Sequence, residues 1–272
     1  MNNPSVRHAA VAGLFYPGSG DALERLLVDL LGQLPESGSN QPKALIVPHA
    51  GYIYSGLTAA FAYRKIFPFR KVIRNVVILG PAHRVHFRGA ATTTLGYFET
   101  PVGRVKINRD IVDDLNTAFD NVASLDEAHR EEHCIEVQLP FLQHVLDKFT
   151  LVPILTGDIT QTQTAEILNY LWDQKDTIFL VSTDLSHFEN YTAARKLDAE
   201  TAAFIENFEY KNLSGHSACG GTSLGGLLVL AKEKNLRIQR LDMRNSGDTG
   251  GGKQSVVGYG SWALFEQDEK GY

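Results

Sequence analysis

Short runs of apolar residues alternate along the chain with longer amphipathic stretches. The runs are rich in Val, Ile and Leu and show no polar alternation, which is typical of strands that are covered on both faces. They are Ala44–Val47, Asn75–Leu79, Thr150–Leu155 and Thr177–Val181. The stretches between them, such as 21–34 and 162–174, have the spacing of amphipathic helices. The pattern predicts an α/β fold, a three-layer α-β-α sandwich around a mostly parallel, mixed central sheet.

Other segments predict strands that are not part of a parallel core. Gly89–Thr94 and Tyr97–Val105 together predict a hairpin-like excursion, and Ser255–Phe265 predicts a closing strand near the carboxyl end. The sequence contains no internal repeat, no low-complexity tract and no long linker. We therefore expect a single domain over residues 1–272.

The composition argues against two classes of partner. Hydrophobic residues make up 43% of the chain and charged residues 21%, which is ordinary for a globular protein. The net charge is −5, and the 26 Lys and Arg residues are scattered without a basic run. A nucleic-acid ligand or an acidic membrane surface would require a concentrated positive charge, so we expect neither.

The number of cysteines and the lengths of the apolar runs indicate the cellular compartment of the protein. Two cysteines are too few for a disulfide framework and suit a reducing environment. The first residues lack the basic and continuous apolar regions of a signal peptide. No apolar run approaches the roughly 20 residues that a membrane-spanning helix needs. These features predict a cytoplasmic protein.

Candidate chemistry collects directly after the predicted strands. In an open α/β sheet, ligands bind in the crevice beyond the carboxyl ends of the strands. His49 and His83 follow two of these runs, and Asp184 and His187 follow a third. A lone histidine near a strand end is more often a hydrogen-bonded structural residue. Three of them at one edge of a sheet indicate a metal site or an acid–base site.

A cysteine lies just before a helical pattern. Cys219 precedes the apolar residues 224–231, and a cysteine at a helix start has its thiolate stabilised by the helix dipole. The alternative is a small buried hydrophobe, but the polar residues 214–217 before it favour a loop. Cys134 lies inside a helical pattern, and we assign it to packing.

The segment Glu131–Pro140 predicts a helix with acidic residues in its first turn. His133 and Glu136 are three residues apart and would share one face of that helix. The pair could orient a metal-bound histidine from outside the coordination sphere. It could equally form a solvated, salt-bridged face, and the residues by themselves favour the solvated face.

The stretch Gly247–Gln254 is close to a phosphate-binding loop in sequence. Gln254 stands where that motif needs a hydroxyl, and a strand pattern follows instead of a helix. Without a helix N-terminus the cradle for phosphate is missing. We therefore expect a flexible glycine loop near the cleft.

Six segments resemble the motifs of Memo-like proteins and occur in that family's order. They are Ala12–Pro17 (AGLFYP), Pro48–Gly56 (PHAGYIYSG), Gly80–His83 (GPAH), Glu132–Phe141 (EHCIEVQLPF), Ser182–His187 (STDLSH) and Cys219–Gly221 (CGG). The similarity extends from residue 8 to about residue 265, so it covers nearly the whole chain. Together the six motifs are specific to this family.

The resemblance implies a metal site. The Memo family is similar in fold to LigB-type extradiol dioxygenases, in which two histidines and a carboxylate hold non-haem iron. By this resemblance His49 and His83 match the ligand histidines, and Cys219 takes the third ligand position. A thiolate in place of a carboxylate favours softer ions such as Cu(I) and Zn(II), while Fe(II) remains compatible. The expected cofactor is iron or copper, with zinc as a further candidate.

The resemblance also implies catalytic groups. His187 matches the acid–base histidine of the dioxygenases, with Asp184 beside it, and His133 is expected near the same site. The first functional hypothesis is a metal-dependent redox enzyme that acts on an unidentified small molecule. The alternatives are an adaptor that keeps the fold without catalysis, and a metal-assisted hydrolase that uses Asp184 and His187. A functional link to radical SAM and AMMECR-type proteins is implied by the resemblance alone.

Overall fold

The computed structural model describes residues 5–35, 38 and 40–267. Strands of the sheet are β1 Val6–Arg7, β2 Ala44–Val47, β3 Asn75–Pro81, β4 Ala90–Thr92, β5 Tyr97–Thr100, β6 Gly103–Ile107, β7 Val122–Ser124, β8 Thr150–Thr156, β9 Thr177–Ser182, β10 His187–Glu189, β11 Arg237–Asn245 and β12 Val256–Phe265. The α-helices are α1 Gly20–Gly32, α2 Tyr52–Ile66, α3 Arg109–Ala118, α4 Asp126–Arg130, α5 Leu139–Val145, α6 Gln161–Trp172, α7 Tyr191–Glu206, α8 Gly221–Glu233 and α9 Ser246–Thr249. Short 3-10 helices are η1 Phe67–Phe69, η2 Glu136–Gln138 and η3 Tyr210–Asn212.

The strands form one twelve-stranded sheet with the order β1-β5-β6-β8-β3-β9-β2-β12-β10 along its main path. The neighbours β8, β3, β9 and β2 are mutually parallel. Their central residues are fully buried, as expected for strands that are covered on both faces. β12 is antiparallel to β2, β10 and β11, so the sheet is mixed. The α/β fold with a mostly parallel sheet is therefore confirmed.

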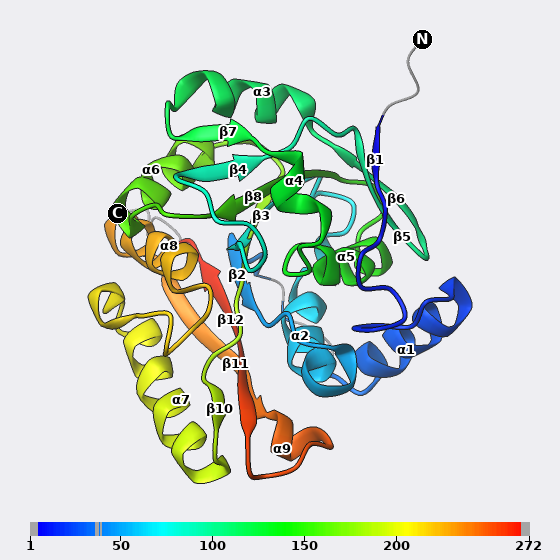
Figure 1. The fold of residues 1–272 in the computed structure, drawn as a ribbon, viewed down its shortest axis with the longest axis vertical. Helices are drawn as coiled ribbons and strands as arrows, with labels where there is room; N and C mark the ends of the chain where they lie inside the picture. Colours follow the sequence, from blue (N-terminus) through cyan, green and yellow to red (C-terminus); the bar gives the residue numbers. More distant parts are fainter. Residues whose placement is uncertain (1–4, 36–37, 39, 268–272) are drawn as a thin grey trace.

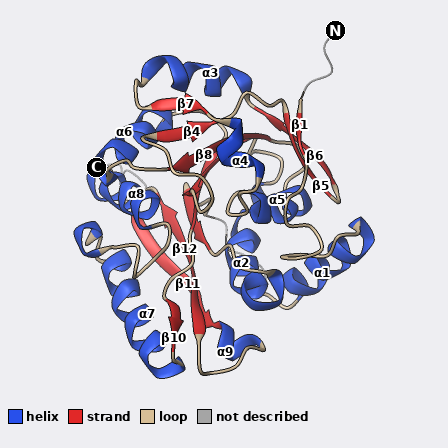
Figure 2. Cartoon of the chain, in the orientation of Figure 1, coloured by secondary structure: helices blue, strands red, loops and turns tan. Residues whose placement is uncertain are grey.

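Helices flank the sheet on both sides (Figures 1 and 2). α2 packs against β2 and β12 and is joined by α1 and α5, while α8 packs against β3 and β9 with α6 beside it. Helix α1 buries Leu23, Leu27, Leu30 and Leu31 along one stripe, and the Ser19 side chain accepts the Ala22 N–H at its start. Among the described residues, no helix combines the length and apolar character that a membrane span needs.

Two predicted elements were wrong. The segment 89–105 is not one hairpin: β5 and β6 pair with each other, but β4 pairs with β7 and β8. The segment 131–140 is not one helix either, because residues 131–135 form turns and loop, followed by η2 and then α5. The Glu132 side chain accepts nearby backbone N–H groups and so competes with helical hydrogen bonding there.

Candidate metal centre

Three strands of the sheet and one helix place four polar side chains at the carboxyl edge of the sheet. His49 lies two residues beyond β2, His83 two residues beyond β3, and Asp184 two residues beyond β9. Cys219 lies two residues before α8. Because β2, β3 and β9 are parallel neighbours, the segments that follow them leave the sheet at one edge.

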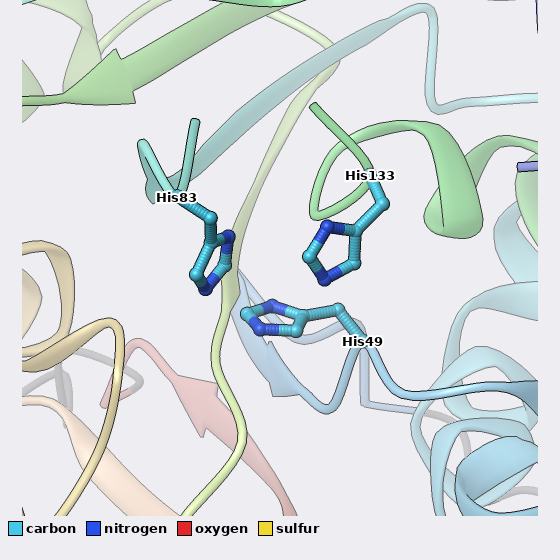
Figure 3. A group of neighbouring side chains, drawn as sticks. All are labelled: His49, His83 and His133. Carbon is cyan, nitrogen blue, oxygen red and sulfur yellow. The ribbon is translucent and has the colours of Figure 1, made fainter. Parts of the chain in front are cut away.

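Three histidine rings converge at this edge (Figure 3). His49, His83 and His133 each offer a ring nitrogen, and these nitrogens lie within 4.8 Å of one another. The His83 and His133 rings are stacked with centroids 4.7 Å apart, and the His49 ring stands edge-on to both at 5.1 and 5.2 Å. This spacing is short enough for one ion to bridge the three rings.

Each of these rings has its Nδ1 next to an oxygen. His49 Nδ1 lies 3.0 Å from Ser182 Oγ, and His83 Nδ1 lies 2.9 Å from Glu132 Oε1. His133 Nδ1 lies 3.2 Å from the same Glu132 oxygen. Metal-bound histidines usually have one ring nitrogen fixed in this way, which orients the other toward the ion. The arrangement therefore leaves the Nε2 atoms for a ligand.

The thiol of Cys219 borders the histidine group. Its Sγ lies 3.2 Å from His49 Nε2 and accepts the Asp184 N–H at 3.3 Å. Burial by itself would raise the pKa of this thiol, but the charge of His49 and hydrogen bonds with His49 and His83 outweigh burial and lower the pKa to about 5. A thiolate beside imidazole nitrogens is a ligand set suited to zinc, copper or iron.

Glu132 connects two of the histidines. Its carboxylate accepts the backbone N–H of His83 at 2.6 Å as well as contacting both ring nitrogens. Burial would raise the pKa of Glu132, but hydrogen bonds with His83 and the charge of that ring lower it to about 2. The His83 pKa is raised to about 10, because hydrogen bonds with Cys219 and Glu132 outweigh the effect of burial. Burial and the nearby charge of His49 lower the pKa of His133 to about 3.

A second group of possible ligands consists of His83, Glu132 and Cys134. Burial raises the pKa of the Cys134 thiol well above its usual value, and its Sγ donates to the Pro81 carbonyl oxygen at 3.2 Å. The protonated, fully buried thiol packs between loop and strand. Cys134 therefore fits the packing role that the sequence predicts.

A cavity of about 560 Å³ opens onto the histidines. Its lining includes His49, His83, His133, Asp184 and His187, the aromatic residues Phe15, Tyr54, Phe188 and Tyr259, and Gly251 and Gly252 of the glycine-rich loop. Gly251 and Gly252 thus border the cleft between α9 and β12, whereas residues 247–249 of the predicted glycine loop belong to the four-residue helix α9. An ion held by the histidines would be accessible to a small molecule in this cavity.

The family model described as Memo-like protein matches residues 7–263. The chain belongs to the Memo family. A MEMO1 family protein from Thermoplasma volcanium is 34% identical over 96% of this chain and 99% of its own length. The MEMO1 family protein from Thermotoga neapolitana is 34% identical over 93% of this chain and 98% of its own length.

A solved structure, that of an uncharacterized protein from Escherichia coli K12, is similar to this Memo-family fold with a TM-score of 0.54. The match covers 82% of this chain and 99% of that chain at 12% sequence identity. At this identity the similarity concerns the fold alone.

The structure of this Memo-family chain brings the predicted site residues together to different degrees. His49, His83 and His133 form the compact group, and Cys219 contacts His49. Asp184 is buried and accepts the His49 backbone N–H at 2.8 Å, so it contacts His49 directly. His187, on β10, lines the same cavity. The catalytic roles of Asp184, His187 and His133 stay predictions.

One pairing inferred from the sequence is wrong. Glu136 does not share a helix face with His133; it is fully buried and binds the Arg7 guanidinium instead. The solvated face predicted for Glu136 is wrong as well, and it is Glu132 that contacts the Nδ1 atoms of His83 and His133. The signal that would have found it is its position directly before His133, in a segment where a carboxylate can reach the next backbone N–H groups.

Proposed function

We propose that this Memo-family protein binds one redox-active transition-metal ion through His49, His83 and Cys219, and that the ion acts on a small molecule in the adjoining cavity. The observation that carries this proposal is the convergence of imidazole rings, each with its Nδ1 next to an oxygen. The rings lie beside a thiol whose pKa is lowered to about 5. Such a preorganised set lowers the cost of assembling ligands around an ion.

The donor set favours particular ions. Two imidazole nitrogens and one thiolate sulfur suit iron, copper or zinc, whereas magnesium and calcium prefer oxygen ligands. A bound iron or copper ion would supply one-electron chemistry to a molecule in the cavity. The proposed redox function therefore requires iron or copper in preference to zinc.

The remaining residues have separable roles in this proposal. Asp184 holds the His49 backbone and so fixes the direction in which that ring enters the site. A ring nitrogen of His133 lies within 4.8 Å of those of His49 and His83, and its lowered pKa keeps the ring neutral. His187 lines the cavity and is positioned to exchange a proton with a bound molecule.

Metal analysis tests the proposal directly. Protein purified without chelator and without nickel-affinity chromatography should contain about one iron or copper ion per chain. His49→Ala and Cys219→Ala should lose this ion, because each removes a proposed ligand. Cys134→Ala is the matched control: it removes the other cysteine and should retain the metal.

Three outcomes would contradict the proposal. Retention of metal by Cys219→Ala would remove the thiolate from the ligand set, and loss of metal by Cys134→Ala would favour the group that contains His83 and Glu132. A stoichiometric zinc content without iron or copper would contradict the redox function and leave a metal-binding protein.

A further inference from the structure

A buried arginine connects the N-terminal segment to the loop that carries His133. Arg7 lies on β1 and is only 3% exposed. Its guanidinium makes three hydrogen bonds of 2.6 Å: Nε donates to the His129 carbonyl oxygen, Nη2 to the Glu132 carbonyl oxygen and Nη1 to the Glu136 carboxylate. One planar fork therefore holds three points along residues 129–136.

The carboxylate of Glu136, on the loop, also binds the N-terminal segment beyond Arg7. It is fully buried and also accepts the backbone N–H groups of Ala10 and Val11 at 2.8 and 3.0 Å. The Tyr16 hydroxyl donates to it at 2.5 Å. Residues 7–16 are thus tied to the loop by charge-assisted hydrogen bonds at both ends of the segment.

Glu132 transmits this contact to the candidate metal centre. Its backbone carbonyl oxygen binds Arg7, while its side chain contacts the Nδ1 atoms of His83 and His133. The same N-terminal segment also contributes Phe15, whose ring lies 4.8 Å from the His133 ring and lines the cavity. A shift of the Arg7 guanidinium would therefore move Glu132 and Phe15, the two side chains that contact the histidine rings.

A buried ion pair is a costly way to attach a strand, because both charges lose their hydration. An apolar contact could attach β1 to the loop at least as well, but it could not fix two carbonyl oxygens in defined directions. The fork geometry of Arg7 supplies this directional constraint at the point where His133 must be placed.

We propose that Arg7 is a positioning residue for the metal centre: through the Glu132 carbonyl oxygen and Glu136 it fixes the loop that orients His83 and His133. This inference rests on the proposed function, because it concerns affinity for the same ion. Arg7 contacts neither the cavity nor a proposed ligand atom through its side chain, so its effect is indirect.

The test uses Co²⁺, whose absorption spectrum reports both affinity and ligand geometry. Arg7→Lys keeps the positive charge opposite Glu136 but loses the fork, and should weaken Co²⁺ binding about 10-fold. Arg104→Lys is the matched control, since Arg104 pairs with Glu99 near the same strands but is largely exposed. The control should bind Co²⁺ as the wild type does.

A double-mutant cycle separates positioning from general destabilisation. In a Glu132→Gln background the Arg7→Lys substitution should change Co²⁺ affinity less than about 2-fold, because the connecting carboxylate is already altered. In a Ser182→Ala background, which alters the His49 anchor, the loss of about 10-fold should persist. An equal loss in both backgrounds would show a merely structural role and overturn the proposal, as would unchanged affinity in Arg7→Lys itself.

Two further measurements keep the test decisive. If Arg7→Lys does not fold, Glu136→Gln removes the charge that the fork binds and should weaken Co²⁺ binding in the same background-dependent way. If the wild type does not bind Co²⁺, crystal structures of metal-free wild type and Arg7→Lys decide the positioning role separately, and the iron and copper analysis alone decides the proposed function. A displaced His133 ring in the variant supports it, and an unmoved ring overturns it.

Discussion

The two sides of the candidate metal centre are built in different ways. On one side, His49 and Cys219 are positioned by regular elements: β2 and β9 are paired up to Val47 and Ser182, and the Thr183 N–H continues the pairing to the Val47 carbonyl oxygen. On the other side, Glu132 and His133 lie in an irregular loop that is positioned by side chains. At the strand ends, backbone register brings His49 to the sheet edge, and Ser182 and Asp184 then orient it, whereas the irregular loop is held by a buried polar network alone.

The two sides also impose opposite shifts on the same type of residue. Burial would lower the pKa of His49, but the nearby Cys219 and Asp184 charges outweigh it and raise the pKa. For His133, burial and the charge of His49 act together and lower the pKa to about 3. In the metal-free protein, a histidine with a raised pKa on the strand-end side thus faces one with a lowered pKa on the loop side.

The largest loss of stability is expected from a substitution of Glu132, whose carboxylate holds the loop. Glu132→Gln replaces a buried acceptor of several N–H groups by an amide, whose NH₂ must face at least one donor. We expect a loss of about 3 kcal/mol in the free energy of unfolding of the metal-free protein. Urea unfolding followed by circular dichroism measures it. Glu131→Gln, at the exposed neighbouring position, is the control, and equal stability of the two variants would mean that the carboxylate does not hold the loop.

The second-largest expected effect is a pH dependence of the free energy of unfolding, and it comes from His129 on the loop side. Burial lowers the pKa of His129 from 6.5 to about 4, so between these values the unfolded chain binds a proton that the folded protein does not. The resulting stability is present above pH 6.5 and is lost as the pH falls toward 4. From pH 7.5 to pH 5 this group should remove about 2 kcal/mol.

The variant His129→Gln isolates this contribution. Urea unfolding at both pH values should show a pH-dependent loss smaller by about 2 kcal/mol in His129→Gln than in the wild type. His216→Gln changes an exposed histidine and should follow the wild type. If all three proteins lose the same stability between the two pH values, His129 is not the source of the loss.

The difference between the two sides also explains what could be predicted from the sequence. His49 and His83 could be found because they directly follow continuous apolar runs, and the edge to which such runs lead is a property of parallel sheets. Cys219 could be found because a helical pattern begins just after it, and α8 begins at Gly221. These signals are local in sequence, and the parallel sheet brings the residues that they mark together in space.

The loop side carried no comparable signal. Glu132 orients two histidines from distant parts of the chain, and Arg7 reaches the loop across more than 120 residues of sequence. The local pattern at 131–140 favours a helix, but the buried network overrides that preference. Similarly, β4 pairs with β7 and β8 instead of β5, because strand partners depend on tertiary packing and not on proximity in sequence.

The smallest loss of stability is expected on the strand-end side, where the Thr183 hydroxyl joins the end of β9 to the start of α8. Thr183 Oγ1 accepts the Gly220 N–H at 2.9 Å and donates to the Asp184 carbonyl oxygen at 2.8 Å, next to Cys219. Thr183→Val keeps the shape and removes both hydrogen bonds, so it should cost about 1 kcal/mol in urea unfolding. Backbone pairing still fixes β2 and β9 in this variant, and the proposed metal should be retained in full. A loss as large as that of Glu132→Gln would show that the strand-end side also depends on its polar side chains, and the distinction between the two sides would fail.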